Sequence, residues 1–197
     1  MSCETKNAMK DSLKKLIEQK PLNKITIADI TSDCGINRMT FYYHFKDIYA
    51  LVEWCIISDA KITSDGRLIW DTWEDYLAHV MNVCYANKDF YLTVLNSMDA
   101  SISSKYILRF STKIAKRIVS EQAEGIRLFS AYKQRLEDYY AYAIMGVIYC
   151  WALNNMEEDI QYIVKYLSLM VKNTKNTLLV HPYIQPTDED SEAEEIQ

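Results

Sequence analysis

CGINRMTFYYHFKDIYAL, residues 34–51, sets aromatic rings and basic side chains next to one another directly after a glycine. Gly35 accepts the left-handed backbone of a sharp turn that ends a helix. Asn37 is the residue type that caps the start of the next helix. Phe41 and Phe45 are four positions apart, so a helix brings them to one face, where they are expected to be buried. The stretch therefore predicts a turn followed by a short helix over about residues 37–43.

This phasing turns away from the core Met39 and a set of side chains with hydroxyl, imidazole or cationic tips: Arg38, Thr40, Tyr42, Tyr43, His44 and Lys46. The major groove of DNA admits a helix, and a guanidinium such as that of Arg38 can bind guanine in a bidentate manner. Met39 and the Thr40 methyl can contact thymine methyl groups, while the ring tips suit phosphates. Paired tyrosines on a helix are, by themselves, more often half-buried packing residues.

Two further helices precede this stretch. Residues 4–19 carry Met9 and Leu13 on one helical face, and Pro21 ends that run. Thr26 and Asp29 have the spacing of a capping box that opens a second short helix. Three helices with a tight turn between the second and third predict a helix-turn-helix unit.

The run ITIADITSDCGINRMTFYYHFKDIYAL, residues 25–51, resembles the DNA-binding segment of TetR-family transcriptional regulators. The resemblance covers roughly residues 5–55 and depends on Thr26, Ala28, Gly35, Thr40-Phe41-Tyr42, His44-Phe45 and Leu51. Many family members have a lysine where this chain has Ile48, so Lys46 becomes the alternative phosphate contact. The N-terminus of a helix attracts phosphate, so Thr26, at the start of the second helix, is a further expected phosphate contact. The expected DNA contacts are Thr26, Asn37, Arg38, Met39, Thr40, Tyr42, Tyr43, His44 and Lys46, with nonspecific attraction from Lys6 and Lys10.

The rest of the chain predicts an all-α fold. Only four glycines and three prolines are present, which favours long helices. Helices are expected at 47–63, 72–87, 88–97, 101–123, 127–154 and 157–178, with breaks at Gly125 and at Asn154-Asn155. The predicted organisation is a helix-turn-helix domain over 1–50, a helical ligand-binding and dimerisation domain over 51–180, and an acidic, unstructured tail over 181–197.

Charge and cysteine content narrow the class of protein. The net charge is −5, but the last ten residues hold six acids and no base, and residues 1–50 hold eight Lys/Arg against six acids. A mildly basic N-terminal region permits DNA binding. Five scattered cysteines predict neither disulfides nor a zinc site and suit the reducing cytoplasm. No apolar run is long enough to cross a membrane, and no signal core, metal site or cofactor motif is present.

Two C-terminal helices favour a homodimer. Ala141, Ala143 and Gly146 are small enough for close helix approach, with larger residues around them. The resemblance to TetR regulators implies that these helices form the subunit interface, through Tyr139, Tyr142, Ala143, Gly146 and Val147. A dimer also brings two recognition helices to a palindromic operator. The alternative is an ordinary bundle core that uses small residues for packing.

The middle of the chain is rich in aromatic rings, which suit a largely apolar ligand pocket. Family members commonly hold an inducer here, and the candidate lining residues are Trp73, Tyr76, His79, Tyr91, Tyr140 and Trp151. Rings at helical spacing are, however, more often core. The runs WEDYLAHV and YYAYAIMGVIYCW are also similar to regulators of dihydroxyacetone kinase operons, a branch that includes an activator working with a kinase-like protein partner.

The sequence thus predicts a dimeric, sequence-specific DNA-binding transcriptional regulator controlled by a small molecule or a protein partner. The alternative is an interaction module of the same fold with weak or lost DNA binding, which the missing lysine at Ile48 favours. An enzyme is not expected: no phosphate loop or nucleophile motif is present, and His79 and Cys84 are five apart, a poor match for one helical face.

Overall fold

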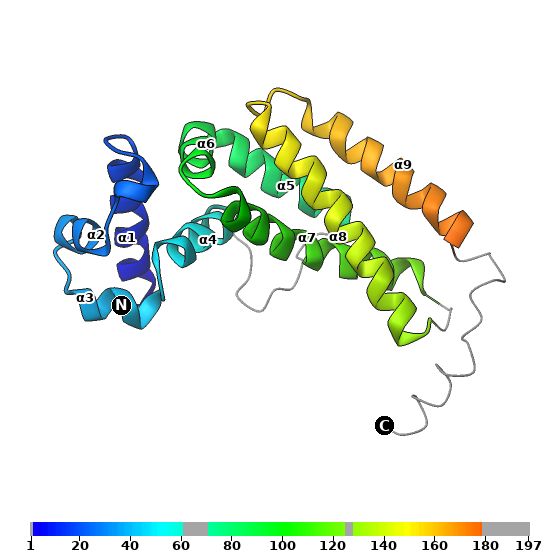
Figure 1. The fold of residues 1–197 in the computed structure, drawn as a ribbon, viewed down its shortest axis with the longest axis horizontal. Helices are drawn as coiled ribbons and strands as arrows, with labels where there is room; N and C mark the ends of the chain where they lie inside the picture. The colour runs from blue at the N-terminus through cyan, green and yellow to red at the C-terminus, as the bar shows by residue number, and fades with distance from the viewer. Residues whose placement is uncertain (1, 61–70, 125–127, 179–197) are drawn as a thin grey trace, which may run out of the picture.

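The structure, a computed structural model, describes residues 2–60, 71–124 and 128–178, and every regular element in these ranges is helical (Figure 1). The predicted all-α fold is confirmed. The N-terminal part contains α1 (Ser2–Ile17), the 3-10 turn η1 (Leu22–Lys24), α2 (Ile27–Asp33), α3 (Arg38–His44) and α4 (Ile48–Asp59). The larger part contains α5 (Trp73–Ala86), α6 (Lys88–Asn96), α7 (Ala100–Gln122), α8 (Ser130–Leu153) and α9 (Ile160–Leu178). Gly125 and the predicted tail lie outside the described residues.

The N-terminal helices share one apolar cluster. Met9 and Leu13 of α1, Ile30 of α2 and Phe41 of α3 are fully buried, as is Leu51 of α4. The predicted domain boundary at residue 50 falls inside α4, whose inner residues belong to this cluster. The division into domains stays a prediction, but the packing unit around α3 includes α4.

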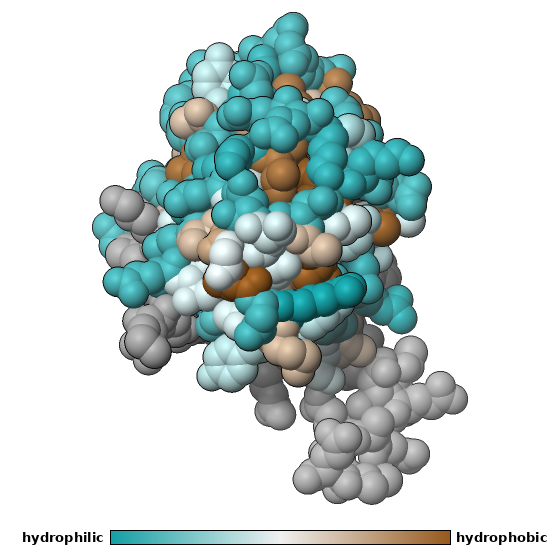
Figure 2. All heavy atoms as spheres, turned by 90° about the vertical axis from the view of Figure 1, so that its left-hand side faces the viewer, coloured by the Kyte–Doolittle hydropathy of each residue, from teal (hydrophilic) through white to brown (hydrophobic). Residues whose placement is uncertain are grey.

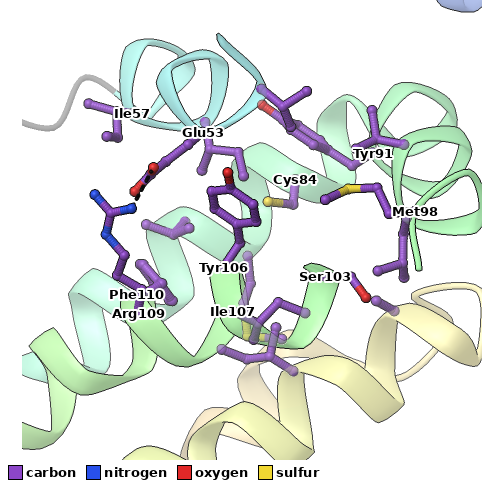
Figure 3. A pocket seen from close by; sticks show the side chains of 18 of the residues that line it. Glu53, Ile57, Cys84, Tyr91, Met98, Ser103, Tyr106, Ile107, Arg109 and Phe110 are labelled. Carbon is purple, nitrogen blue, oxygen red and sulfur yellow. Dashed lines mark ion pairs between the residues drawn. The ribbon is translucent and has the colours of Figure 1, made fainter. Parts of the chain in front are cut away.

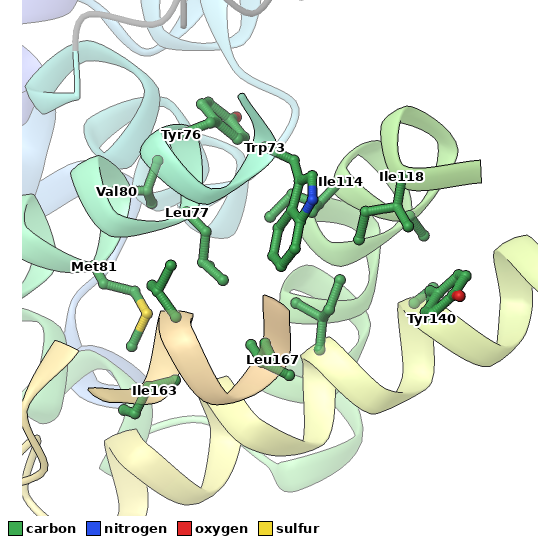
Figure 4. Close-up of a cluster of buried hydrophobic side chains, with 14 of the residues drawn as sticks. Trp73, Tyr76, Leu77, Val80, Met81, Ile114, Ile118, Tyr140, Ile163 and Leu167 are labelled. Atoms are coloured by element: carbon green, nitrogen blue, oxygen red, sulfur yellow. The ribbon is translucent and has the colours of Figure 1, made fainter. Parts of the chain in front are cut away.

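The larger bundle packs α7 along α8 and α5 along α9 (Figure 1). Figure 4 shows the Trp73 ring directed from α5 toward Ile114 and Ile118 of α7, with Leu77 of α5 and Leu167 of α9 beside it. Burial of such side chains contributes roughly 1.5–3 kcal/mol each, so this cluster is the main stabilising unit of the bundle. Through α5, α6 and α7 the bundle meets α4 and the N-terminal helices.

The connection between α8 and α9 reverses the chain at two residues with left-handed backbone, Asn155 and Met156, at φ values of 58° and 53°. The Met156 amide donates to the carbonyl oxygen of Trp151 at 2.8 Å. The predicted break at Asn154-Asn155 is confirmed. None of the described helices combines the length and the apolar character needed to cross a membrane.

Candidate DNA-binding surface, subunit interface and cavity

The turn before α3 has the backbone that its sequence predicts. Gly35 has a φ of 66°, in the left-handed region that glycine adopts at little cost. Asn37 caps α3, because its Oδ1 accepts hydrogen bonds from the Thr40 amide at 2.8 Å and the Thr40 hydroxyl at 3.0 Å. Phe41 and Phe45 are buried, which fixes the orientation of the helix.

The opposite side of α3 is open to solvent. Met39 is 75% exposed, Tyr43 is 83% exposed and Tyr42 is about half exposed. Arg38 is exposed as well, with its guanidinium carbon 5.9 Å from the centre of the Tyr42 ring. The end of the molecule that carries α2 and α3 faces the viewer in Figure 2, where hydrophilic and intermediate side chains cover most of the surface. Arg38, Met39, Tyr42 and Tyr43 therefore share one accessible face, whereas the predicted contacts Thr40 and His44 are half-buried.

Thr26 and Asp29 form the predicted capping box at the start of α2. The Asp29 amide donates to the Thr26 hydroxyl at 3.2 Å, and the Thr26 amide donates to the Asp29 carboxylate at 2.8 Å. Lys20 also donates to that carboxylate at 2.8 Å, and this bond, together with those from the Thr26 amide and hydroxyl, lowers the pKa of Asp29 to about 2. The Thr26 hydroxyl donates to Asp29 too, so its phosphate contact stays a prediction that must compete with the cap.

The basic residues near α3 divide into two groups. Lys46 is 72% exposed, and its amino group lies 3.9 Å from the carboxylate of Asp47, while Ile48 packs against the N-terminal cluster. Lys10, expected to attract DNA, instead binds Asp59 at 3.0 Å on the side of α1 that faces α4. The Lys6 amino group lies 5.8 Å from the ring centres of Phe45 and Trp54. Both lysines lie in α1 and face other helices, so their nonspecific attraction of DNA stays a prediction.

Lys24 is an exposed basic residue near α2 that was not among the predicted DNA contacts. It ends η1 and is exposed two positions before Thr26, beside the start of α2. Within the described residues no acidic side chain forms an ion pair with it. In the sequence, Lys24 lies between the turn that follows Pro21 and the helix that Thr26 caps, and this position was the available signal.

A second group of exposed apolar side chains lies on α8 and α9. Its members are Tyr139, Tyr142, Leu153, Tyr162, Tyr166, Leu169 and Met170. Ala143 is exposed beside them, and a Cβ placed on Gly146 would meet no atom within 4 Å, so this side of α8 is unobstructed. Val147 is half-buried against the subunit's own core. Ala141 is buried in that core, so only part of the small-residue run lies on the open face.

A cavity of about 180 Å³ lies between α4, α5, α6, α7 and the end of α8 (Figure 3). Its wall is mostly carbon and includes Tyr76, Tyr91 and Trp151 from the predicted set. Glu53 of α4 and Arg109 of α7 pair at 3.1 Å at one end of it. The described residues contain no group of three His, Cys, Asp or Glu side chains that could hold a metal ion.

Three predicted pocket residues do not line this cavity. Trp73 is buried in the bundle core (Figure 4). Tyr140 is also buried there and donates to the side-chain oxygen of Gln122 at 2.9 Å. His79 is turned toward the end of α4, where its Nε2 lies 2.9 Å from the carbonyl oxygen of Ala60. Their aromatic character serves packing between helices rather than the cavity wall.

The α4 and α7 residues of the cavity wall were not predicted. They include Tyr49, Glu53 and Ile56 from α4 and Ser103, Tyr106, Ile107 and Phe110 from α7. The signal in the sequence was α4 itself: IYALVEWCIISD is apolar on all sides, so it must cover a second surface besides the N-terminal cluster.

Two family models match the chain. One, described as "Bacterial regulatory proteins, tetR family", matches residues 11–55, and one described as "Transcriptional regulator C-terminal region" in the TetR series matches residues 71–173. Among curated proteins, none matches this sequence.

Solved structures share the fold. A chain titled "Dihydroxyacetone kinase operon activator DhaS" superposes with a TM-score of 0.65 at 16% identity, covering 88% of this chain and 97% of that one. A TetR transcriptional regulator from Streptococcus agalactiae 2603V superposes with a TM-score of 0.57 at 22% identity, covering 86% and 94%. The helix-turn-helix, the C-terminal bundle and both family matches lead to one conclusion: this chain belongs to the TetR family of bacterial transcriptional regulators, which are DNA-binding proteins and not enzymes.

Proposed function

We propose that this chain is a homodimeric regulator in which α3 of each subunit reads base edges in the major groove of a palindromic operator. The exposed face of α3 carries this proposal. Arg38 and Met39 begin that face, Phe41 and Phe45 hold it outward, and Tyr43 and Lys46 flank it with groups that bind phosphates.

The dimer part of the proposal depends on α8 and α9. Seven large apolar side chains on these helices are exposed in the single subunit, which is unusual for a surface that stays in water. Two-fold pairing of this face would cover Tyr139 and Tyr142 and place Gly146 where a partner helix can approach. Two recognition helices related by that axis would meet half-sites about one helical turn or more apart, roughly 34 Å.

The effector part depends on the cavity between α4 and α7. Tyr76, Tyr91 and Trp151 line it, and α4 separates it from the N-terminal cluster. A molecule bound in the cavity would contact α4, which packs against both the N-terminal cluster and the larger bundle. A small molecule bound here would therefore change the position of α3, and a protein partner acting on the same helices is the alternative.

The test is selection of duplexes from a random-sequence pool by the purified protein, followed by a mobility-shift titration at fixed salt. We expect enrichment of one two-fold-symmetric sequence and a complex that contains two chains. Weak binding with no enriched sequence would instead favour an interaction module of the same fold. Lys116 is exposed on α7, in the larger bundle, so Lys116→Ala tests whether any loss of a lysine weakens binding. We expect this variant to leave the titration unchanged.

A further inference from the structure

The wall of the cavity excludes charge from its interior. Burial raises the pKa of the Cys84 thiol and the Tyr76 hydroxyl to about 12, so both are neutral at pH 7. Among the described residues, the wall has three charged side chains: Glu53 and Arg109 pair with each other at one end of the cavity (Figure 3), and Lys113, one helical turn beyond Arg109 on α7, is exposed to solvent. An ion placed deep in this cavity, away from these three side chains, would lose its hydration without gaining a partner of opposite charge, which is strongly unfavourable.

The size of the cavity selects a compact molecule. An engineered apolar cavity of about 150 Å³ in another protein binds benzene, so the 180 Å³ here suits a molecule of one or two fused rings or a branched aliphatic of similar size. A polyhydroxylated molecule of that volume would leave most of its hydroxyl groups without hydrogen-bond partners against this carbon-lined wall.

Tyr91 lies in the cavity wall and also reaches a polar cluster outside it. Its ring packs edge-on against Phe90 with centres 4.9 Å apart, and its hydroxyl donates to Oδ2 of Asp59 at 3.1 Å. Asp59 is the last residue of α4. One side chain thus connects the space between α5, α6 and α7 to the end of the helix that packs under the DNA-binding unit.

Asp59 in turn holds α1. Lys14 donates to its Oδ2 at 2.8 Å and Lys10 donates to its Oδ1 at 3.0 Å, and the Asp59 side chain is only 12% exposed. Lys14 also donates to Asn87 at 3.1 Å, at the junction of α5 and α6. Because α1 packs on α2 and α2 packs on α3, a shift of these ion pairs changes the placement of the recognition helix.

We infer that the cavity binds a compact, uncharged and mostly apolar molecule, and that Tyr91 transmits its presence to α1 through Asp59. This inference rests on the proposed function, because the transmitted change is read as DNA affinity. A ligand shifts DNA affinity only if it binds the DNA-bound and DNA-free conformations of the protein with different affinities, and DNA then shifts ligand affinity by the same factor.

The first experiment measures the ligand class by calorimetric titration of the full chain. Indole is the probe, indole-3-carboxylate is the same ring with a charge, and glycerol is a small polyol. We expect saturable binding of one indole per chain, at least about tenfold weaker binding of the carboxylate, and no binding of glycerol. Tighter binding of either comparison molecule than of indole, or no binding of indole, overturns the ligand class.

Variants locate that binding. Ile107→Phe fills the cavity from α7 and should abolish indole binding, while Ile102→Phe changes the same helix at a half-buried position outside the wall and should not. Leu95→Phe fills the cavity from α6 and provides an independent test if the first variant fails to fold. Indole binding that survives in a folded filled variant contradicts the location.

The second experiment measures transmission with the selected duplex. Tyr91→Phe keeps the ring in the wall and removes the hydroxyl, so indole should bind within about threefold of wild type but no longer change DNA affinity. Tyr85→Phe, on the exposed side of α5, should retain the indole effect.

The outcomes separate this inference from the proposed function. Wild type that binds DNA with an affinity indifferent to bound indole overturns transmission and leaves the proposed function standing. If wild type binds indole but no duplex, the proposed function is overturned, and DNA affinity can no longer report transmission. An indole effect that persists in Tyr91→Phe assigns transmission to another residue and contradicts the role of Tyr91.

Discussion

The Lys14 amino group lies 2.8 Å from the carboxylate of Asp59, 45 residues further along the chain. This ion pair joins the first helix of the DNA-binding unit to the end of α4, at the junction with the larger bundle. Lys10 pairs with the same carboxylate at 3.0 Å. The two units are therefore held together by a charged cluster as well as by apolar packing.

Asp59→Asn should lower the free energy of unfolding by about 1–3 kcal/mol at pH 7, because it removes the charge that two partly buried lysines share. The measurement is urea denaturation. Asp11→Asn, an exposed carboxyl on α1, should change stability by less than about 0.5 kcal/mol.

The same cluster predicts a pH dependence. Burial would raise the pKa of Asp59, but hydrogen bonds from Lys14 and Lys10 outweigh it and hold that pKa below its usual range. A lowered folded-state pKa means that the contribution is present above the unfolded value of about 4 and is lost as the pH falls through the folded value. Wild type and Asp59→Asn should thus converge in stability in acid, and a difference independent of pH would contradict the ion-pair explanation.

Thr26→Ala should destabilise the chain by about 1 kcal/mol through loss of the helix cap, while Thr26→Ser should restore most of it. Thermal unfolding followed by circular dichroism measures both. Equal losses in the two variants would show that the hydroxyl's hydrogen bond is not what stabilises α2.

Tyr43→Phe should weaken binding to specific and nonspecific duplexes alike, by about fivefold, because the hydroxyl is expected to contact phosphate rather than a base. Tyr43 is 83% exposed, so the free energy of unfolding should change by less than about 0.5 kcal/mol. Fluorescence anisotropy with both duplexes makes the comparison, and a loss confined to the specific duplex would assign Tyr43 to base recognition instead.

Lys46→Ala should reduce the slope of log affinity against log salt by about 0.9 for each DNA phosphate that the lysine neutralises. A dimer neutralises two phosphates with its two copies of Lys46, so the expected reduction is about 1.8, whereas for a monomer it is about 0.9. Mobility-shift titrations over a range of salt concentrations measure the slope. An unchanged slope would mean that Lys46 does not take the place of the lysine that many family members have where this chain has Ile48.

Tyr142→Arg should raise the dimer dissociation constant by at least about 100-fold, since pairing would bury two like charges at the symmetric interface. Sedimentation velocity measures the change. Tyr142 is 58% exposed in the subunit, so the monomer should keep its helical content, and Tyr85→Arg on α5 is the matched control. A variant that remains dimeric places the interface elsewhere.

The local features of the DNA-binding unit could be predicted from sequence because they depend on residues only a few positions apart. Asn37 and Thr40 define a cap, Gly35 defines a turn, and Phe41 with Phe45 defines a buried face. The long helices of the bundle follow from the same short-range periodicity.

The cavity could be predicted only in part, because its wall depends on which helices meet in space. Tyr76 and His79 lie three apart on α5, yet Tyr76 faces the cavity and His79 faces Ala60. The burial of Lys10 against Asp59 is likewise invisible in sequence, since 49 positions separate the two residues. Such pairings follow from the packing of α1 against α4, which no local pattern specifies.

Base reading by α3 is tested most directly by parallel selection of duplexes with wild type and Arg38→Ala. Wild type should select a two-fold-symmetric sequence with a guanine at one position of each half-site, and Arg38→Ala should select the same sequence with that position degenerate, at a cost of about 1–3 kcal/mol in specific binding. An identical selected sequence from both proteins, or none from wild type, would contradict the account.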